Sequence, residues 1–228
     1  TQSRSSAASD VYKRQSMNYE LEHRLKDAGK SEVVEIIHPK YLDEIKFSFI
    51  RQSEPNGLGH AILQAKHIIT DDFFGIILAD DLILSEPGCL KQLLEIHDKT
   101  QSSVIGVFSA SENQVSNYGV ISSKNIDGIE KVDGIVEKPK PADAPSNLAV
   151  FGRYILSKDI FLNIEQTKPG LNNEIQLTDA IQDLISNQDV FALEFEGRRF
   201  DCGSKEGYIS AIIDRALSID KYKSIVEK

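Results

Sequence analysis

Two patterns of apolar residues alternate along the chain. Apolar residues spaced three and four apart predict helices, whereas short continuous or alternating apolar runs predict strands. Helices are predicted over residues 18–29, 31–38, 61–69, 90–97, 157–164, 175–186 and 204–217. Strands are predicted over residues 46–51, 74–79, 103–108, 118–122, 129–136, 148–156 and 190–195. The chain therefore predicts an α/β fold.

The two halves of this pattern differ. Up to Ser111, strands and helices alternate as they do around parallel sheets, and the run over 74–79 predicts a strand buried on both faces. After Ser111, short strands follow one another with Gly turns, and a Pro-rich bridge spans 139–145. We expect a mixed, mainly parallel sheet with antiparallel strands added to it. The segment 31–38 stays open between helix and strand because it is rich in Val and Ile.

The first fifteen residues have a composition of their own. They hold four Ser and three basic residues, and only Val11 and Tyr12 are large and apolar. Such a segment cannot bury a face, so we expect residues 1–15 to be disordered or to be a lead foreign to the fold. The folded domain is then expected over residues 16–228.

Charge and hydropathy argue against two classes of protein, those that bind nucleic acid and those that span a membrane. The chain has 26 Lys and Arg against 35 Asp and Glu, which gives a net charge of −9. It has no cluster of basic residues of the kind that binds the phosphates of nucleic acid, so we expect no nucleic-acid partner. The longest apolar stretch, 73–79, is shorter than the roughly 20 residues that cross a bilayer. Because the chain also shows no signal-peptide pattern, we expect no membrane partner and a cytoplasmic location. Cys89 and Cys202 are expected to be reduced thiols.

Acidic residues follow the predicted strand over 74–79. Asp80 and Asp81 come directly after its last apolar residue. In open α/β sheets, ligands gather at the carboxyl ends of the strands. One or two carboxylates together with a substrate phosphate are the usual way in which a protein holds Mg²⁺. The two acids are therefore candidates for a Mg²⁺ site, and solvated loop acids are the alternative.

Three further segments place polar groups at the ends of predicted elements. The glycines of 57–59 precede a helix, where they let the backbone approach a ligand or simply form a turn. Glu137 and Lys138 end a strand, and because successive strand residues point to opposite faces, they share a side only if the strand twists or ends there. A surface ion pair is the alternative. Asp201 ends another strand before a Gly turn and could supply a carboxylate opposite Asp80.

The order of these segments is more specific than any one of them. Arg51-Gln52 is followed by GLGHAIL, ILADDLIL, SNYGVI, GIVEKPKPADAPSNLAVFGRYIL, NNEIQLTDAI and RRFDCGSKEGY. From about Asn18 to Leu217 the chain resembles the bacterial UTP:glucose-1-phosphate uridylyltransferases, also called UDP-glucose pyrophosphorylases. These sugar nucleotidyltransferases have a Rossmann-like α/β core, which the resemblance implies for this chain.

The resemblance also implies a reaction. In this family a phosphate oxygen of glucose 1-phosphate attacks the α-phosphorus of UTP, which yields UDP-glucose and pyrophosphate with Mg²⁺ as the cofactor. The implied partners are thus UTP, glucose 1-phosphate and UDP-glucose. Family members often form homo-oligomers through C-terminal helices, and Tyr208, Ile212 and Ile213 would serve such a contact or belong to the core.

Roles for individual residues come with the resemblance. Asp80 is implied as the Mg²⁺ ligand and Asp201 as the second acid that faces it, with Asp81 as a neighbour only. Gln52 is implied as the residue that reads the uracil edge, and Gly57 as the glycine whose backbone approaches the base.

The implied sugar and phosphate contacts lie in the second half of the chain. Gly119 is implied to offer its backbone to the sugar, and Glu137 to accept hydrogen bonds from glucose hydroxyls. Lys138 is implied as the catalytic cation on the sugar phosphate, and Lys205 as a further phosphate contact.

The sequence departs from the family in one respect. The family's first strand and its G-x-G-T-R phosphate loop do not occur among the 228 residues. We therefore expect residues 16–228 to be an incomplete nucleotidyltransferase domain and the chain to be an inactive or weakly active fragment. The alternatives are a non-catalytic UDP-sugar-binding module and a nucleotidyltransferase for another base or sugar.

Overall fold

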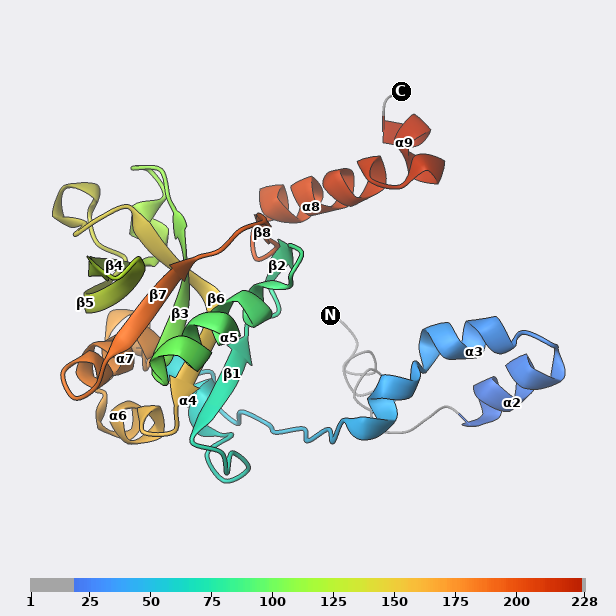
Figure 1. Cartoon of the computed structure of the whole chain (residues 1–228), viewed down its shortest axis with the longest axis horizontal. Coiled ribbons are helices and arrows are strands. Elements are labelled where there is room, and N and C mark those ends of the chain that lie inside the picture. Colours follow the sequence, from blue (N-terminus) through green and yellow to red (C-terminus); the bar gives the residue numbers. More distant parts are fainter. Residues whose placement is uncertain (1–18, 227–228) are drawn as a thin grey trace. The chain divides into compact units, whose positions relative to one another are not determined.

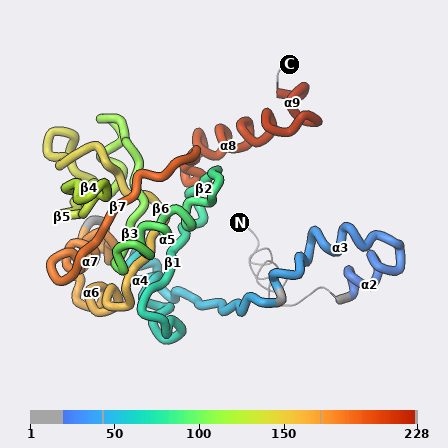
Figure 2. Tube along the Cα trace, in the orientation of Figure 1, coloured from blue at the N-terminus to red at the C-terminus, as the bar shows by residue number. Residues whose placement is uncertain are grey.

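The structure is a computed structural model that describes residues 19–226 (Figures 1 and 2). The segment 1–15, predicted as a disordered or foreign lead, lies outside the described residues, and so does Asn18, the predicted start of the first helix. Contacts group the residues up to Arg51 in one unit and those from Gln52 in another. Each unit is described by itself.

Short helices make up the first unit. They are α2 (Tyr19–Asp27), α3 (Ser31–Ile37) and the 3₁₀ helix η1 (Lys40–Glu44). The segment 31–38 is therefore helical. Gly29 follows α2 in the left-handed conformation, with φ at +69°, which is the usual way in which a helix ends. His38 Nδ1 lies 3.2 Å from the buried carboxylate of Glu22, which ties the two α-helices together.

The strand predicted over 46–51 is wrong. Residues 45–51 form neither helix nor strand, and Phe47 and Phe49 are exposed. An alternating segment becomes a strand where a neighbouring strand completes its backbone hydrogen bonds and covers one of its faces. Among the described residues, no strand pairs with this segment.

A six-stranded sheet and a two-stranded ribbon form the second unit. The sheet has the order β1-β6-β3-β7-β5-β4. Its strands are β1 (Phe73–Ile77), β3 (Ser103–Ser109), β4 (Gly119–Ile126), β5 (Ile129–Glu137), β6 (Leu148–Ser157) and β7 (Val190–Glu194). The ribbon pairs β2 (Asp81–Leu84) with β8 (Arg198–Asp201).

The sheet is mixed, as the sequence predicted. β3 and β7 are parallel neighbours, whereas the other hydrogen-bonded pairs of the sheet are antiparallel. β6 runs opposite to β1 and β3, and β5 runs opposite to β4 and β7. The strands β1, β3, β4 and β7 therefore share one direction, and the strands β5 and β6 are inserted among them in the opposite direction.

Helices cover both faces of the sheet. They are α4 (Leu58–Leu63), α5 (Cys89–Thr100), α6 (Ile160–Gln166) and α7 (Leu177–Ile185), with 3₁₀ turns η2 (Val115–Asn117), η3 (Pro141–Asp143) and η4 (Leu171–Asn173). α5 packs against β3, β6 and β7, and Figure 1 shows it across the strands. The helices α4, α6 and α7 contribute to the larger core on the other face.

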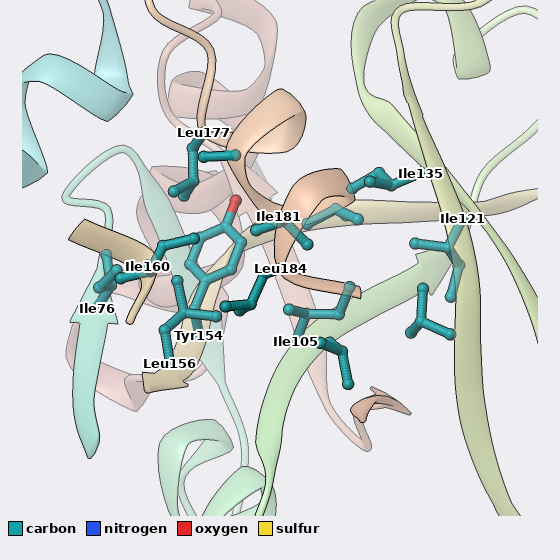
Figure 3. Close-up of a cluster of buried hydrophobic side chains, with 14 of the residues drawn as sticks. Ile76, Ile105, Ile121, Ile135, Tyr154, Leu156, Ile160, Leu177, Ile181 and Leu184 are labelled. Atoms are coloured by element: carbon teal, nitrogen blue, oxygen red, sulfur yellow. The ribbon is translucent and has the colours of Figure 1, made fainter. Parts of the chain in front are cut away.

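Alternate residues of the central strands serve two different cores. Ile105 of β3 and Tyr154 of β6 pack with Ile181 of α7, as Figure 3 shows. Their chain neighbours Val104 and Ile155 belong to the smaller core on the α5 side. This alternation is the consequence of the two-residue period of a strand, and it explains why these strands are apolar throughout.

Two predictions at the edge of the sheet need correction. β1 is not buried on both faces, since Ile77 is 58% exposed, because β1 is the outer strand of the described sheet and pairs only with β6. The helix predicted over 61–69 is shorter, since α4 ends at Leu63. Beyond it most backbone hydrogen bonds join residues three apart, as from Ala65 N–H to Ile62 O, which is the pattern of turns.

The chain passes from β8 into α8 (Lys205–Leu217) and then α9 (Asp220–Val226), as Figure 2 shows. Ser204 caps α8 by accepting the Gly207 N–H at 3.0 Å. Tyr208, Ile212 and Ile213 are exposed on α8, so the alternative that placed them in the core is wrong. No helix between residues 19 and 226 has the length and apolar character needed to cross a membrane.

Candidate active site

A cavity of about 330 Å³ opens in the second unit beyond the carboxyl end of β1. Its walls come from the ribbon, from the start of β4, from the end of β5, from the middle of β6 and from the start of α7. Five of the predicted site residues line it, namely Asp80, Gly119, Glu137, Lys138 and Asp201. The topology thus brings together groups that are far apart in the sequence.

Asp80 and Asp201 lie on the ribbon side of the cavity. Asp80 directly precedes β2, Asp201 ends β8, and the Cys202 N–H donates to Asp80 O at 2.7 Å. A Cβ atom at Gly203 would lie 3.1 Å from Asp201 Oδ1 and 3.4 Å from Asp80 Oδ2. The two carboxylates therefore border one small space, which is open because residue 203 is a glycine.

This arrangement fits a divalent cation of the Mg²⁺ type. Mg²⁺ takes one or two carboxylates and completes its shell with water and substrate phosphate. The Asp80 carboxylate is exposed and makes no hydrogen bond with the described residues, so it is available as a ligand. Across residues 19–226, no group of three or more His, Cys, Asp or Glu residues is arranged to hold a metal by itself.

Asp81 has a different environment from its neighbour Asp80. Its carboxylate is buried, accepts the Gly152 N–H through Oδ2 at 2.7 Å and accepts Arg199 Nε through Oδ1 at 2.6 Å. Arg153 also donates to the Asp81 backbone carbonyl at 2.6 Å. Asp81 is therefore a structural acid that fixes the ribbon to β6.

The Arg199 guanidinium lies among aromatic rings. Its Cζ is 4.5 Å from the Phe108 ring centroid, 4.9 Å from that of Tyr118 and 5.8 Å from that of Phe151. The Tyr118 hydroxyl donates to Asp201 Oδ2 at 2.9 Å. Burial raises the pKa of Tyr118 above its usual value near 10, so the hydroxyl keeps its proton at neutral pH. Asp201 thus has a permanent hydrogen-bond donor at one oxygen.

Glu137 and Lys138 do share one side of their strand. β5 ends at Glu137, and Lys138 takes a left-handed backbone with φ at +45°, while its N–H donates to Tyr118 O at 3.0 Å. The Lys138 ammonium consequently turns back to within 3.5 Å of Glu137 Oε1. Both groups line the cavity, and the Lys138 side chain is 39% exposed, so they form an ion pair at the surface that also borders the cavity.

Thr178, in the first turn of α7, holds the Glu137 carboxylate. Its hydroxyl donates to Glu137 Oε2 at 2.9 Å. Gly119 lies against both groups, since a Cβ atom there would be 2.6 Å from Thr178 Cγ2 and 3.3 Å from Glu137 Oε2. Any side chain at residue 119 would displace this pair, so the glycine is a packing requirement of the site.

Tyr154 forms part of the cavity floor. The residue is 5% exposed, and Figure 3 shows its hydroxyl pointing toward Leu177, which also lines the cavity. Burial, together with the charges of Asp81 and Glu137, raises the pKa of Tyr154 well above its ordinary value. The phenol therefore stays neutral and presents a hydrogen-bond donor beneath the charged residues.

The cavity does not include Gln52, Gly57 or Lys205. The Gln52 amide nitrogen donates to Gly57 O at 3.2 Å and lies 2.9 Å from His60 Nδ1. Gly57 has φ at +95°, and a Cβ atom there would lie 2.8 Å from Ile175 O. In this structure the glycine accordingly packs against the segment before α7. Lys205 begins α8, shortly after Asp201.

Comparison with known proteins decides the family. The sequence profile described as "Nucleotidyl transferase" matches residues 11–216, which is most of the chain. The chain belongs to this nucleotidyl transferase family. The matched region begins within the segment that was predicted to be a foreign lead.

Similar nucleotidyl transferases confirm the resemblance predicted from the sequence. A UTP–glucose-1-phosphate uridylyltransferase of Pseudomonas aeruginosa is 45% identical over 198 residues, which cover 86% of this chain and 71% of that protein. One from Streptococcus pyogenes is 45% identical over 212 residues, which cover 90% of this chain and 69% of that protein. The chain thus spans about seven tenths of the length of these relatives.

Solved nucleotidyl transferase structures show the same fold. The structure of a UDP-glucose pyrophosphorylase complexed with UDP-glucose is 43% identical, has a TM-score of 0.74 and is aligned over 86% of this chain and 72% of its own. A UTP-bound UGPase from Acinetobacter baumannii is 33% identical, has a TM-score of 0.80 and is aligned over 96% of this chain and 76% of its own. The predicted α/β nucleotidyltransferase core is therefore confirmed.

Among the cavity residues that sequence reasoning missed are Tyr118, Tyr154, Thr178 and Arg199. Two of them had a local signal. Arg199 precedes Asp201 by two positions and so shares its face of β8, and Tyr118 directly precedes Gly119. Thr178 and Tyr154 had no such signal, because their contacts depend on how α7 and β6 pack.

Proposed function

We propose that the chain transfers a uridylyl group from UTP to glucose 1-phosphate and releases pyrophosphate. One observation carries the proposal, namely that a single cavity joins the acid pair Asp80 and Asp201 to the ion pair Glu137 and Lys138. Two phosphorylated substrates repel each other, so their reaction needs a cation site and a basic side chain in the same place. The relatives at 45% identity are enzymes with this activity by name.

The sugar phosphate would lie at Glu137 and Lys138. Thr178 donates to Glu137 Oε2, so Oε1, which lies 3.5 Å from the Lys138 ammonium, would accept hydroxyl groups of the glucose ring with its remaining lone pairs. The Lys138 ammonium would bind the phosphate as a point charge and act as the catalytic cation. Gly119 lies beside Glu137 without a side chain, so the ring can approach the backbone there.

Asp80 and Asp201 would hold Mg²⁺ in the space beside Gly203. When bound there, Mg²⁺ supplies positive charge to the phosphate oxygens of the substrates. Gly203 also donates its N–H to Asp201 Oδ1 at 3.1 Å, which limits rotation of that carboxylate. The protein thus contributes an ordered pair of oxygen ligands.

The reaction is an in-line displacement at the α-phosphorus of UTP. A phosphate oxygen of glucose 1-phosphate forms the new bond to phosphorus. The bond from phosphorus to the oxygen that bridges the α- and β-phosphates breaks, and its electron pair leaves with pyrophosphate. The attacking oxygen is ionised at neutral pH, so the protein needs no general base. Lys138 contributes by aligning the anions and offsetting their charge.

The base is proposed to bind near Gln52 and Gly57. The amide nitrogen of Gln52 is already used within the protein, so its carbonyl oxygen is the group that remains to accept the N3–H of uracil. Gly57 would bring the backbone to the base, and Lys205 would make a further phosphate contact. We also propose a cytoplasmic location and a homo-oligomer formed through the exposed apolar residues of α8.

The test is release of pyrophosphate by the 228-residue chain from UTP and glucose 1-phosphate, with Mg²⁺ present. We expect slow release, as from a weakly active fragment, that requires both substrates and that is lost in Lys138→Ala. Lys158→Ala is the matched control, because Lys158 pairs with Asp72 on the surface. A panel with dTTP, CTP and ATP accompanies the assay. A preference for one of these over UTP would overturn the choice of base.

A second candidate function is binding of UDP-glucose without turnover. It is favoured by the cavity itself, which brings Gly119, Glu137 and Lys138 together as contacts for a sugar phosphate. Calorimetry with UDP-glucose separates the two candidates. Micromolar binding without pyrophosphate release would support the binding module, and the absence of both binding and release would reject both functions for this chain.

A further inference from the structure

The Asp201 carboxylate is held at both of its oxygens. Oδ2 accepts the Tyr118 hydroxyl at 2.9 Å, and Oδ1 accepts the Gly203 N–H at 3.1 Å. The Oδ1 atom is also the one that borders the open space shared with Asp80. The Tyr118 contact therefore determines which oxygen of Asp201 faces the cation site.

The direction of hydrogen bonding through Tyr118 is fixed. A guanidinium can only donate and an ionised carboxylate can only accept. Arg199 Nη1 lies 3.4 Å from the Tyr118 hydroxyl, which in turn lies 2.9 Å from Asp201 Oδ2. The hydroxyl must consequently accept from Arg199 and give its proton to Asp201. No other assignment satisfies all three groups.

Arg199 itself has little freedom to move. Its side chain is 11% exposed, and its Nε donates to the buried Asp81 carboxylate at 2.6 Å. Phe108 lies edge-on to Tyr118, with ring centroids 5.2 Å apart, and the Arg199 guanidinium lies over both rings, with Cζ 4.5 and 4.9 Å from their centroids. Packing of this kind holds the Tyr118 ring in one place.

The register of the ribbon explains why the arginine Arg199 is needed between β2 and β8. Asp81 and Asp201 are directly opposite each other on β2 and β8. Like charges in such a pair repel each other. Arg199, two residues before Asp201 on the same face of β8, is diagonal to Asp81 and neutralises it. Arg199 balances the charge of Asp81, and the Asp201 carboxylate is then available for a metal cation.

We propose that Tyr118, held by Arg199, is a positioning residue that orients the Asp201 carboxylate toward a divalent cation. The inference rests on the proposed function, because it assumes that Asp80 and Asp201 hold Mg²⁺ in uridylyl transfer. The new element is a series of hydrogen-bonded side chains that runs from Asp81 through Arg199 and Tyr118 to Asp201. Through this series of hydrogen bonds, the buried ion pair of Asp81 and Arg199 determines the geometry of the cation site.

The test removes only the hydroxyl. Tyr118→Phe keeps the ring against Phe108 and Arg199, and Tyr41→Phe is the matched control because Tyr41 is an exposed tyrosine outside the cavity. Mn²⁺ binding to the 228-residue chain is followed by the electron paramagnetic resonance signal of the free ion, with UDP-glucose present. UDP-glucose binding is measured separately by calorimetry in EDTA.

We expect Tyr118→Phe to raise the Mn²⁺ dissociation constant about tenfold, as is common when a group that orients a metal ligand is lost. UDP-glucose binding in EDTA should change less than about twofold, and Tyr41→Phe should match the parent chain. Arg199→Lys keeps the charge beside Asp81 but loses the planar fork, so it should weaken Mn²⁺ binding in the same direction.

Three outcomes would overturn the proposal. Parental Mn²⁺ affinity in Tyr118→Phe, with loss of affinity in Asp201→Asn, would reject the positioning role and leave the proposed function intact. Equal weakening of Mn²⁺ and of metal-free UDP-glucose binding would make Tyr118 a general structural or substrate contact. Parental Mn²⁺ affinity in Asp201→Asn, or no Mn²⁺ binding by the parent chain, would reject the cation site and with it both proposals.

Discussion

The two sides of the cavity are organised by different physical means. On the ribbon side, Asp80 and Asp201 are placed by a buried ion pair and by an arginine between aromatic rings. On the opposite side, where we propose that the sugar binds and which we call the sugar side, Glu137 is placed by the neutral hydroxyl of Thr178 and by the close fit of Gly119. Charge pairing determines the first geometry, and steric fit determines the second.

This difference predicts how each side responds to substitution. A change of charge on the ribbon side leaves a partner uncompensated in a buried place, which is costly. A change of volume on the sugar side displaces a hydrogen-bonded pair, and a compensating change of volume should restore it. The four predictions below test this contrast, beginning with the largest expected effect.

The largest effect is expected for Asp201→Asn. The substitution keeps the shape and removes the charge that would hold Mg²⁺, so pyrophosphate release should fall by about 10³-fold, as for the loss of a main electrostatic group at a reaction centre. Asp98→Asn, on the exposed side of α5, is the matched control and should keep the parental rate. If Asp201→Asn released pyrophosphate at nearly the rate of the control, then the Asp201 carboxylate would have no role in the reaction.

Asp81→Asn should reduce the stability of the fold. It leaves Arg199 without its buried partner, so the free energy of unfolding in urea should fall by about 3 kcal/mol. The control is Asp72→Asn, which breaks the exposed pair with Lys158 and should leave the urea midpoint almost unchanged. Similar midpoints for the two variants would show that the ribbon does not depend on its ion pair.

Gly119→Ala should affect the sugar side through volume. The new methyl group would meet Thr178 Cγ2, so we expect a loss of about 2 kcal/mol in unfolding free energy, together with weaker binding of UDP-glucose in calorimetry. Thr178→Ser removes that Cγ2 methyl group and keeps the hydroxyl on Glu137. The double variant should therefore recover most of the loss. Equal defects in the single and double variants would contradict the steric account.

The smallest effect is expected for Thr178→Val. Valine keeps the volume of threonine but lacks the hydroxyl that donates to Glu137 Oε2. We expect about fivefold weaker binding of UDP-glucose, equivalent to about 1 kcal/mol for one hydrogen bond. Thr178→Ser should bind like the parent chain. If serine and valine were equally weak, then the packing of the methyl group, and not the hydroxyl, would hold Glu137.

Much of the fold could be predicted because burial leaves a direct record in the sequence. β3 and β6 are apolar at nearly every position, since alternate residues enter two cores. β1 has the same appearance but is an outer strand with Ile77 exposed, because a run of apolar residues does not show whether a neighbour covers both faces. The segment 46–51 alternates correctly, yet no described strand pairs with it.

Part of the site could be predicted because charged residues stand at the ends of predicted strands, where ligands usually bind. Asp80, Asp201, Glu137 and Lys138 were identified as candidates and line one cavity. Glu137 and Lys138 share a side because Lys138 has a left-handed backbone. The two-residue period of a strand could not predict that conformation. The contact of Tyr118 with Asp201 joins residues 83 positions apart, and only the packed ribbon brings them together.

The ribbon has a consequence for the order of events during synthesis. Asp81 and Arg199, whose pairing closes it, are 118 positions apart in the chain. Contacts at such a separation form late, because a long loop must close before they contribute any stability. While the ribosome is still making residues before β8, β2 has no partner strand and Asp80 has no companion acid. The nascent protein therefore cannot bring Asp201 beside Asp80 until the strands of the sheet, including β7, have been synthesised.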